Sequence, residues 1–128
     1  MTCKKERILV IDDSVTMRRI VTKVLRELGF TEVDEADNGK EALVMLQAGS
    51  YDLAIADWNM PLMTGIELLK AVRADERLKH IPFIMLTAEG QKHNILEAVK
   101  ADVSQYVMKP FTADLLARKI TRALAAGR

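Results

Sequence analysis

Five short apolar stretches recur along the chain at near-regular intervals, at residues 8–11, 31–36, 53–56, 83–86 and 106–108. They are rich in β-branched residues, as strands are, and the second is the weakest of the five. The segments between them carry apolar residues at helical spacing instead of in alternation. This order predicts a parallel sheet that helices cover on both faces.

The segment after the first stretch has the clearest helical pattern. Its apolar residues follow the i, i+3, i+4, i+7 spacing of one buried stripe: Met17, Ile20, Val21, Val24, Leu25 and Leu28. Gly29 then marks the C-terminus of this helix. Asn38 and Thr64 each precede a glutamate by three residues, which is the capping-box pattern of a helix start. Two more helices are expected, one around residues 95–99 and one after Thr112.

These elements fill residues 1–128 and leave no linker or low-complexity tract, so we expect a single domain. Because crossovers between parallel strands are right-handed, the pattern predicts an open, doubly wound α/β domain with a five-stranded parallel sheet. The length agrees with this expectation, since 128 residues lie below the roughly 150 that serve as a prior for one domain.

Charge and composition exclude several classes of protein. The chain carries 19 Lys plus Arg against 18 Asp plus Glu, and this balance offers no basic field for nucleic acid. The one cysteine, Cys3, cannot form an internal disulfide, which favours the reducing cytosol. No uncharged stretch approaches the ~20 residues that span a bilayer, and the run at 8–11 is too short for a signal peptide. We therefore expect a cytoplasmic protein without a membrane segment.

Side chains that can bind metal or take part in catalysis follow four of the predicted strands. Asp12 and Asp13 follow the first strand, Asp57 the third, Thr87 the fourth and Lys109 the fifth. In open α/β sheets ligands bind at the carboxyl ends of the strands, so these side chains are expected at one edge. Three carboxylates there repel one another, which raises their pKa values unless a cation or Lys109 offsets the charge. Mg²⁺ suits such a set, because it prefers one or two carboxylates, waters and phosphate oxygens.

One of the three carboxylates then stays free to act as a nucleophile. Carboxylates accept phosphoryl groups as aspartyl phosphates, and the protein around them positions groups and neutralises charge. Asp57 is the expected acceptor, because it lies on the central strand between the acidic pair and the Thr87 and Lys109 side chains. The same region also allows a purely structural interpretation, in which Asp13 or Ser14 caps the first helix.

Four motifs occur together at this spacing: Asp12-Asp13, DWNMP at 57–61, TAE at 87–89 and YVMKPF at 106–111. In this combination the whole chain resembles the two-component receiver domains, and among them the CheY-like chemotaxis response regulators. The resemblance implies a flavodoxin-like fold of five βα units. It also implies a signalling protein, not a turnover enzyme, that a histidine kinase phosphorylates on Asp57 in a reaction dependent on Mg²⁺.

The resemblance also assigns roles to individual residues. The metal ligands it implies are Asp12, Asp13, Asp57 and the backbone carbonyl of Asn59. The groups that carry the phosphoryl chemistry are Asp57, Lys109 and Thr87. Dephosphorylation is tuned at Asn59 and Glu89. The switch and the partner face comprise Thr87, Tyr106, Ile95, Val99, Met108 and Lys119, although Tyr106 as an ordinary core aromatic is an alternative that spacing does not exclude.

A monomer is expected, with a histidine kinase, an output protein and a phosphatase as partners. The flagellar motor switch protein is the expected output partner, and the alternative is a phosphate sink or phosphorelay intermediate that binds no motor. Because two residues follow the last predicted helix, we expect no DNA-binding effector domain. The chain departs from the family at Gly90 and at Asp102 and Gln105, where CheY-like receivers usually carry glycines between the fourth helix and the fifth strand.

Other uses of an α/β sheet are disfavoured. A phosphohydrolase of the haloacid dehalogenase type needs a second acid two residues after the nucleophile, and Asn59 stands there instead. A nucleotide-binding domain needs a glycine-rich first turn, whereas Asp12 and Asp13 repel a pyrophosphate.

Overall fold

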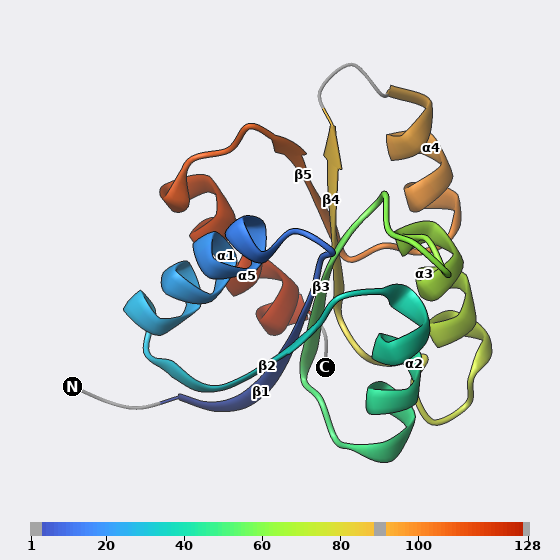
Figure 1. Cartoon of the computed structure of the whole chain (residues 1–128), viewed down its shortest axis with the longest axis horizontal. Coiled ribbons are helices and arrows are strands. Elements are labelled where there is room, and N and C mark those ends of the chain that lie inside the picture. Colours follow the sequence, from blue (N-terminus) through green and yellow to red (C-terminus); the bar gives the residue numbers. More distant parts are fainter. Residues whose placement is uncertain (1–3, 89–91, 127–128) are drawn as a thin grey trace.

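The computed structural model describes residues 4–88 and 92–126, in which five strands alternate with five helices (Figure 1). The strands are β1 (Lys4–Ile11), β2 (Phe30–Ala36), β3 (Leu53–Asp57), β4 (Phe83–Ala88) and β5 (Gln105–Lys109). The helices are α1 (Val15–Glu27), α2 (Gly39–Ala48), α3 (Gly65–Ala74), α4 (Lys92–Lys100) and α5 (Ala113–Ala126). All neighbouring strands pair in parallel, in the order β2-β1-β3-β4-β5. The predicted flavodoxin-like α/β fold is confirmed.

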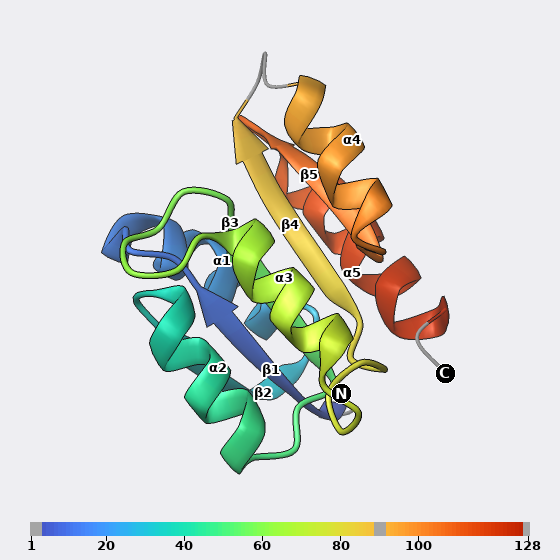
Figure 2. The same cartoon turned by 90° about the vertical axis from the view of Figure 1, so that its right-hand side faces the viewer.

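Helices cover both faces of the sheet. Helices α1 and α5 lie on one face, and α2, α3 and α4 lie on the other (Figures 1 and 2). Alternate residues of β1 divide between the two cores: Ile8 and Val10 pack toward α1 and α5, and Leu9 and Ile11 pack toward the opposite layer. Because both faces are buried, the strand is apolar without interruption, which is the pattern of a parallel sheet.

The helices begin where the capping patterns predict. Asn38 and Thr112 each accept a backbone N–H three residues further on, at 2.8 and 3.1 Å. Thr64 forms a full capping box with Glu67. Ser14, not Asp13, caps α1, so the Asp13 carboxylate is not used as the cap. No helix within the described ranges is long and apolar enough to cross a bilayer.

Two local expectations are wrong. Ile20, assigned to the buried stripe of α1, is 43% exposed. Successive residues on a helix point about 100° apart, and Val21 already faces the sheet, so Ile20 lies on the flank. Strand β1 begins at Lys4, four residues before the predicted start. At this start the Lys4 N–H donates to the Gly29 carbonyl at 2.9 Å, and Lys4 pairs with Phe30 of β2.

Gly65 opens α3 directly against the end of β3. A Cβ at this position would lie 2.3 Å from the Asp57 carbonyl oxygen and 2.8 Å from Met85 Sδ. We therefore expect Gly65→Ala to lower the free energy of unfolding by about 1–3 kcal/mol, because the methyl group forces a backbone shift. Urea denaturation measures the change. Lys70→Ala, at an exposed position of α3, should cost less than about 0.5 kcal/mol, and an equally mild Gly65→Ala would contradict the expectation.

Candidate functional site

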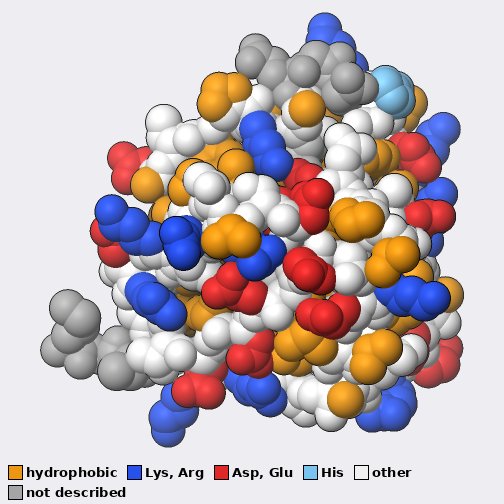
Figure 3. Space-filling view, in the orientation of Figure 1, with side chains coloured by type: hydrophobic (Ala, Val, Ile, Leu, Met, Phe, Trp, Pro, Cys, Tyr) orange, Lys and Arg blue, Asp and Glu red, His pale blue; other side chains and the backbone are white. Residues whose placement is uncertain are grey.

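The carboxyl ends of β1 and β3 bring three aspartates together. Asp12, Asp13 and Asp57 each offer a carboxylate oxygen within 4.8 Å of the others. Asp12 and Asp57 are buried, at 2% and 8% exposure, whereas Asp13 is exposed. Acidic side chains gather near the middle of the face drawn in Figure 3. The predicted juxtaposition of these carboxylates is thus present in the fold.

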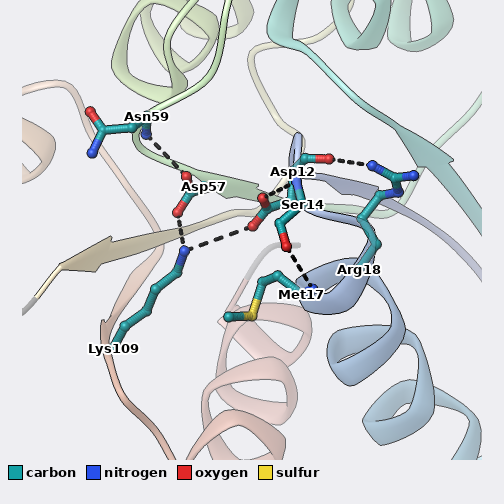
Figure 4. Close-up of polar contacts among 7 residues, drawn as sticks. All are labelled: Asp12, Ser14, Met17, Arg18, Asp57, Asn59 and Lys109. Atoms are coloured by element: carbon teal, nitrogen blue, oxygen red, sulfur yellow. Dashed lines mark hydrogen bonds and ion pairs between the residues drawn. The ribbon is translucent and has the colours of Figure 1, made fainter.

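Lys109 reaches this cluster from the end of β5, across β4. Its ammonium group donates to Asp57 Oδ1 and lies 3.8 Å from Asp12 Oδ2 (Figure 4). The peptide bond between Lys109 and Pro110 is cis. One cation therefore faces two buried carboxylates, which leaves the site with an excess of negative charge.

The Asp57 carboxylate is held on both oxygens. Lys109 binds Oδ1, and the backbone N–H of Asn59 donates to Oδ2 at 3.2 Å. The Asn59 side chain is exposed and points away from Asp57 (Figure 4). The loop after β3 thus orients the carboxylate through its backbone, a contact that sequence reasoning missed because every residue type offers an N–H.

The surroundings of Asp12 shift the pKa of its carboxyl group. The pKa of Asp12 is raised to about 6, mainly by burial and also by the Asp57 and Asp13 carboxylates. The Ser14 backbone N–H, which donates to Asp12 Oδ1 at 2.9 Å, and the Lys109 ammonium oppose the shift. The sequence predicted raised pKa values from mutual repulsion, whereas the structure assigns the larger part at Asp12 to burial.

Two buried oxygens at this edge have no hydrogen-bond partner, Asp12 Oδ2 and Thr87 Oγ1. Thr87 is 2% exposed and lies on β4, one residue beyond the pairing of Asp57 with Leu86. Leaving a buried polar atom unpaired costs about 1–3 kcal/mol, so a group that stays unpaired is a candidate for contact with a ligand. The chemistry of the two atoms fits a cation at Asp12 and an anionic oxygen at Thr87.

The donor set fits a hard divalent cation. It contains oxygen atoms only, two of the acids are buried, and Asp12 Oδ2 makes no hydrogen bond within the described fold. Mg²⁺ prefers this kind of site, which leaves coordination positions for waters and phosphate oxygens. A soft metal would require thiolate or imidazole ligands, and the described cluster holds only carboxylates.

The residues expected at the partner face lie around β5, the edge strand of the sheet. Helix α4 covers one side of this edge and α5 the other (Figure 2). Val99 and Met108 are exposed, Ile95 is half-buried, and Lys119 Nζ lies 5.4 Å from the centre of the Tyr106 ring. Tyr106 is half-buried, so its ring is not part of the sealed core. The residues expected at the partner face therefore lie on the neighbouring elements α4, β5 and α5.

Three further positions from the sequence analysis are Glu89, Gly90 and Asp102. Glu89 and Gly90 lie outside the described residues. Asp102 adopts φ 66° between α4 and β5, the left-handed conformation for which the family usually has glycine. Leu96, with 58% exposure, is an additional apolar side chain of α4 that the sequence-based partner face did not include.

Comparison with known proteins agrees with the geometry. The response regulator receiver domain family matches residues 8–121. The chain is 57% identical over 116 residues to chemotaxis protein CheY of Pseudomonas aeruginosa, covering 91% of this chain and 94% of that protein. It is similar to the chemotaxis response regulator CheY4 of Vibrio cholerae, with a TM-score of 0.86, 36% identity and coverage of 94% and 100% of the two chains.

A further solved structure is the receiver domain of a sensor histidine kinase from Pseudomonas aeruginosa. Its TM-score is 0.86, with 25% identity over 96% of this chain and 100% of that one. That structure has a magnesium ion coordinated in its active site cleft.

Proposed function

The chain belongs to the response regulator receiver family, and from this premise we propose that it is a CheY-like chemotaxis regulator that accepts a phosphoryl group on Asp57. One observation carries the proposal: the Asp57 carboxylate lies beside Lys109 and two further acids at the carboxyl edge of the sheet. A carboxylate nucleophile beside a lysine and a cation site supplies the positioning and the charge neutralisation that aspartyl phosphate formation uses.

The proposed cofactor is Mg²⁺, held by Asp12, Asp13, Asp57 and the backbone carbonyl of Asn59. Asp12 Oδ2, which lacks a hydrogen-bond partner, and the all-oxygen donor set support this assignment. When bound, Mg²⁺ neutralises negative charge on the transferring phosphoryl oxygens. The magnesium ion in the related histidine kinase receiver supports the same choice of metal.

The chain's own residues then perform the transfer. An Asp57 carboxylate oxygen attacks the phosphorus of a phosphohistidine on the kinase, so a P–O bond forms while the P–N bond breaks. The leaving histidine nitrogen keeps the electron pair. Lys109, already paired with Asp57, stays beside the new phosphoryl oxygens and offsets their charge. The Thr87 hydroxyl donates to one of them, which gives this buried group its missing partner.

The output of the switch follows from the new contact between Thr87 and the phosphoryl group. As Thr87 shifts toward the phosphoryl group, the half-buried Tyr106 ring turns inward and the face around β5 changes shape. Ile95, Val99 and Met108 lie on or beside that face, which binds a protein partner in the cytoplasm. The proposed partner is the flagellar motor switch, on the strength of similarity to proteins named for chemotaxis. Hydrolysis, tuned at Asn59 and Glu89 or by a phosphatase, ends the signal.

A binding measurement tests this output. Fluorescence anisotropy of a labelled flagellar switch-protein peptide is recorded with Mg²⁺, with and without beryllofluoride as an acyl phosphate mimic. We expect the mimic to raise peptide affinity by about 5- to 150-fold, the usual range of allosteric coupling. Asp57→Asn should remove this increase. No increase in the wild-type protein would reject motor binding and favour the phosphate sink or relay.

Tyr106→Ala should separate the switch from the site. We expect partner affinity with the mimic to fall by about tenfold, because the ring contributes a buried contact in the active form. The phosphorylation rate should stay within about twofold, since Tyr106 is not among the groups proposed to hold the phosphoryl oxygens. Peptide anisotropy and the rate of acetyl phosphate-dependent phosphorylation measure the two effects. Equal loss of both would show that Tyr106 acts on the site itself.

Mg²⁺ affinity should depend on pH through Asp12. Its pKa is raised to about 6, so the carboxylate takes up a proton as the pH falls through that value. A protonated carboxyl is a poor ligand, so affinity should fall by up to about tenfold per pH unit below it. Trp58, the only tryptophan, is 8% exposed and follows Asp57, so its fluorescence monitors the titration. An affinity that is constant from about pH 7.5 to about pH 5 would contradict the pKa of Asp12.

A further inference from the structure

Three of the four polar groups of Asp12 are fixed by hydrogen bonds within the protein. Its N–H donates to the Ala36 carbonyl of β2 at 3.1 Å. Its Oδ1 accepts from the Ser14 N–H at 2.9 Å, and its carbonyl oxygen accepts from Arg18 Nη1 at 2.6 Å. Only Oδ2 has no hydrogen-bond partner. Lys109 Nζ lies 3.8 Å from this oxygen, beyond hydrogen-bond distance, so the direction of the oxygen depends mainly on how firmly the other three groups are held.

Arg18 has an unusual place in the sequence for a cation. It stands near the N-terminus of α1, four residues after the Ser14 cap, where the helix dipole disfavours positive charge. Its side chain is nevertheless only 16% exposed, and Nε pairs with Glu35 Oε1 of β2 at 2.8 Å. Figure 4 shows Arg18 on the side of Asp12 opposite Lys109 and Asp57. The guanidinium thus contacts the turn from behind the carboxylate cluster.

We infer that Arg18 is a positioning residue for the metal site, acting through the backbone carbonyl of Asp12, and that Glu35 orients Arg18. The inference rests on the proposed function, since it concerns Mg²⁺ binding at Asp12. Arg18 connects three elements at this point: the turn after β1, the first turns of α1 and the end of β2. Holding them together fixes the turn and, with it, the direction of Asp12 Oδ2.

The carbonyl of Asp12 needs this donor because no helix bond reaches it. The first hydrogen bond of α1 runs from the Arg18 N–H to the Ser14 carbonyl, two residues beyond Asp12. In a variant without Arg18 the Asp12 carbonyl would lose its guanidinium donor. It would not gain free access to water, because Asp12 is only 2% exposed. Rotation of the peptide toward another donor would turn the attached carboxylate as well. Partners of this kind behind a metal ligand typically change affinity by 10- to 100-fold.

Charge and position predict opposite results for the removal of Arg18. If the guanidinium acted only as a charge, its removal would tighten binding, because it repels Mg²⁺. If it acts by holding the Asp12 carbonyl, its removal weakens binding in spite of the gain in negative charge. The sign of the change in affinity therefore distinguishes the positioning role from an electrostatic one.

The test is the Mg²⁺ dissociation constant, measured by Trp58 fluorescence and by calorimetry on the full chain. We expect Arg18→Met to weaken binding by about tenfold. Arg18→Lys keeps the charge and offers a single donor nitrogen, so it should recover part of the loss. Glu35→Gln should weaken binding by a smaller factor. Arg19→Met is the matched control: it removes the same charge from the next, exposed position of α1 and should stay within about twofold.

Urea curves in EDTA establish that each variant is folded under the titration conditions. Unchanged or tighter binding by Arg18→Met overturns the inference, as does an equal loss in Arg19→Met, which would point to the charge of the helix as a whole. If Arg18→Met does not fold, Glu35→Gln decides, and its unchanged affinity overturns the inference. A wild-type chain that binds no Mg²⁺ would refute the proposed function instead, so the two failures are distinguishable.

Discussion

Asp57→Asn is expected to abolish phosphoryl acceptance while the chain stays folded. The amide has nearly the shape of the carboxylate, and its oxygen still accepts the Asn59 N–H that now reaches Asp57 Oδ2 at 3.2 Å. An amide oxygen is a far weaker nucleophile than a carboxylate, so no acyl phosphate forms at this position. Incorporation of phosphate from radiolabelled acetyl phosphate in the presence of Mg²⁺ measures the loss.

Asp114→Asn provides the matched control, because it makes the same replacement at an exposed aspartate in the first turn of α5. It should incorporate phosphate at the wild-type rate. If Asp57→Asn also kept the wild-type rate, the acceptor would be another residue, and the assignment of Lys109 and Thr87 to the phosphoryl oxygens would fail with it.

Asp12→Asn is expected to change stability in opposite directions with and without Mg²⁺. The pKa of Asp12 is raised from 3.8 to about 6, so the folded state binds the proton more tightly than the unfolded state. The ionised form therefore destabilises the fold, and stability is lost as the pH rises between these values. At neutral pH without metal, the neutral amide should raise the free energy of unfolding by about 1–3 kcal/mol.

With Mg²⁺ the order reverses. At a free concentration of about one thousand times the dissociation constant, the wild-type protein gains about 4.1 kcal/mol, which exceeds the advantage of the variant without metal, and a variant with a damaged site gains much less. Urea denaturation in EDTA and in Mg²⁺ measures both effects. Glu32→Gln neutralises an exposed carboxylate of β2 and should show neither. Destabilisation of Asp12→Asn in EDTA would mean that the ionised carboxylate contributes favourably to the fold.

Much of the fold follows from local signals in the sequence. Strands buried on both faces are uninterrupted apolar runs, and 53–56 and 83–86 are such runs with fully buried residues. The signals for helix starts are equally local, since the Asn38 and Thr64 side chains each accept a hydrogen bond from a backbone N–H three residues away. The strand ends then place Asp12 and Asp57 at one edge, because parallel strands share a direction.

What the sequence does not show depends on contacts distant in the chain. The start of β1 is an example, since the Lys4 N–H donates to the Gly29 carbonyl at 2.9 Å and Lys4 pairs with Phe30 of β2. Arg18 is the clearest case at the site, since its partners are a backbone carbonyl and a carboxylate of β2. Its one signal in the sequence is a cation where the helix dipole disfavours one.

The central claim is that Asp57 carries the phosphoryl group, and chemical trapping tests it most directly. The chain is incubated with acetyl phosphate and Mg²⁺, reduced with borohydride and digested, and the peptides are identified by mass spectrometry. An acyl phosphate is reduced to an alcohol, so we predict homoserine at position 57 and nowhere else, and none in the sample treated with EDTA. Homoserine at another aspartate, or none at all in a folded protein that binds Mg²⁺, would contradict the claim.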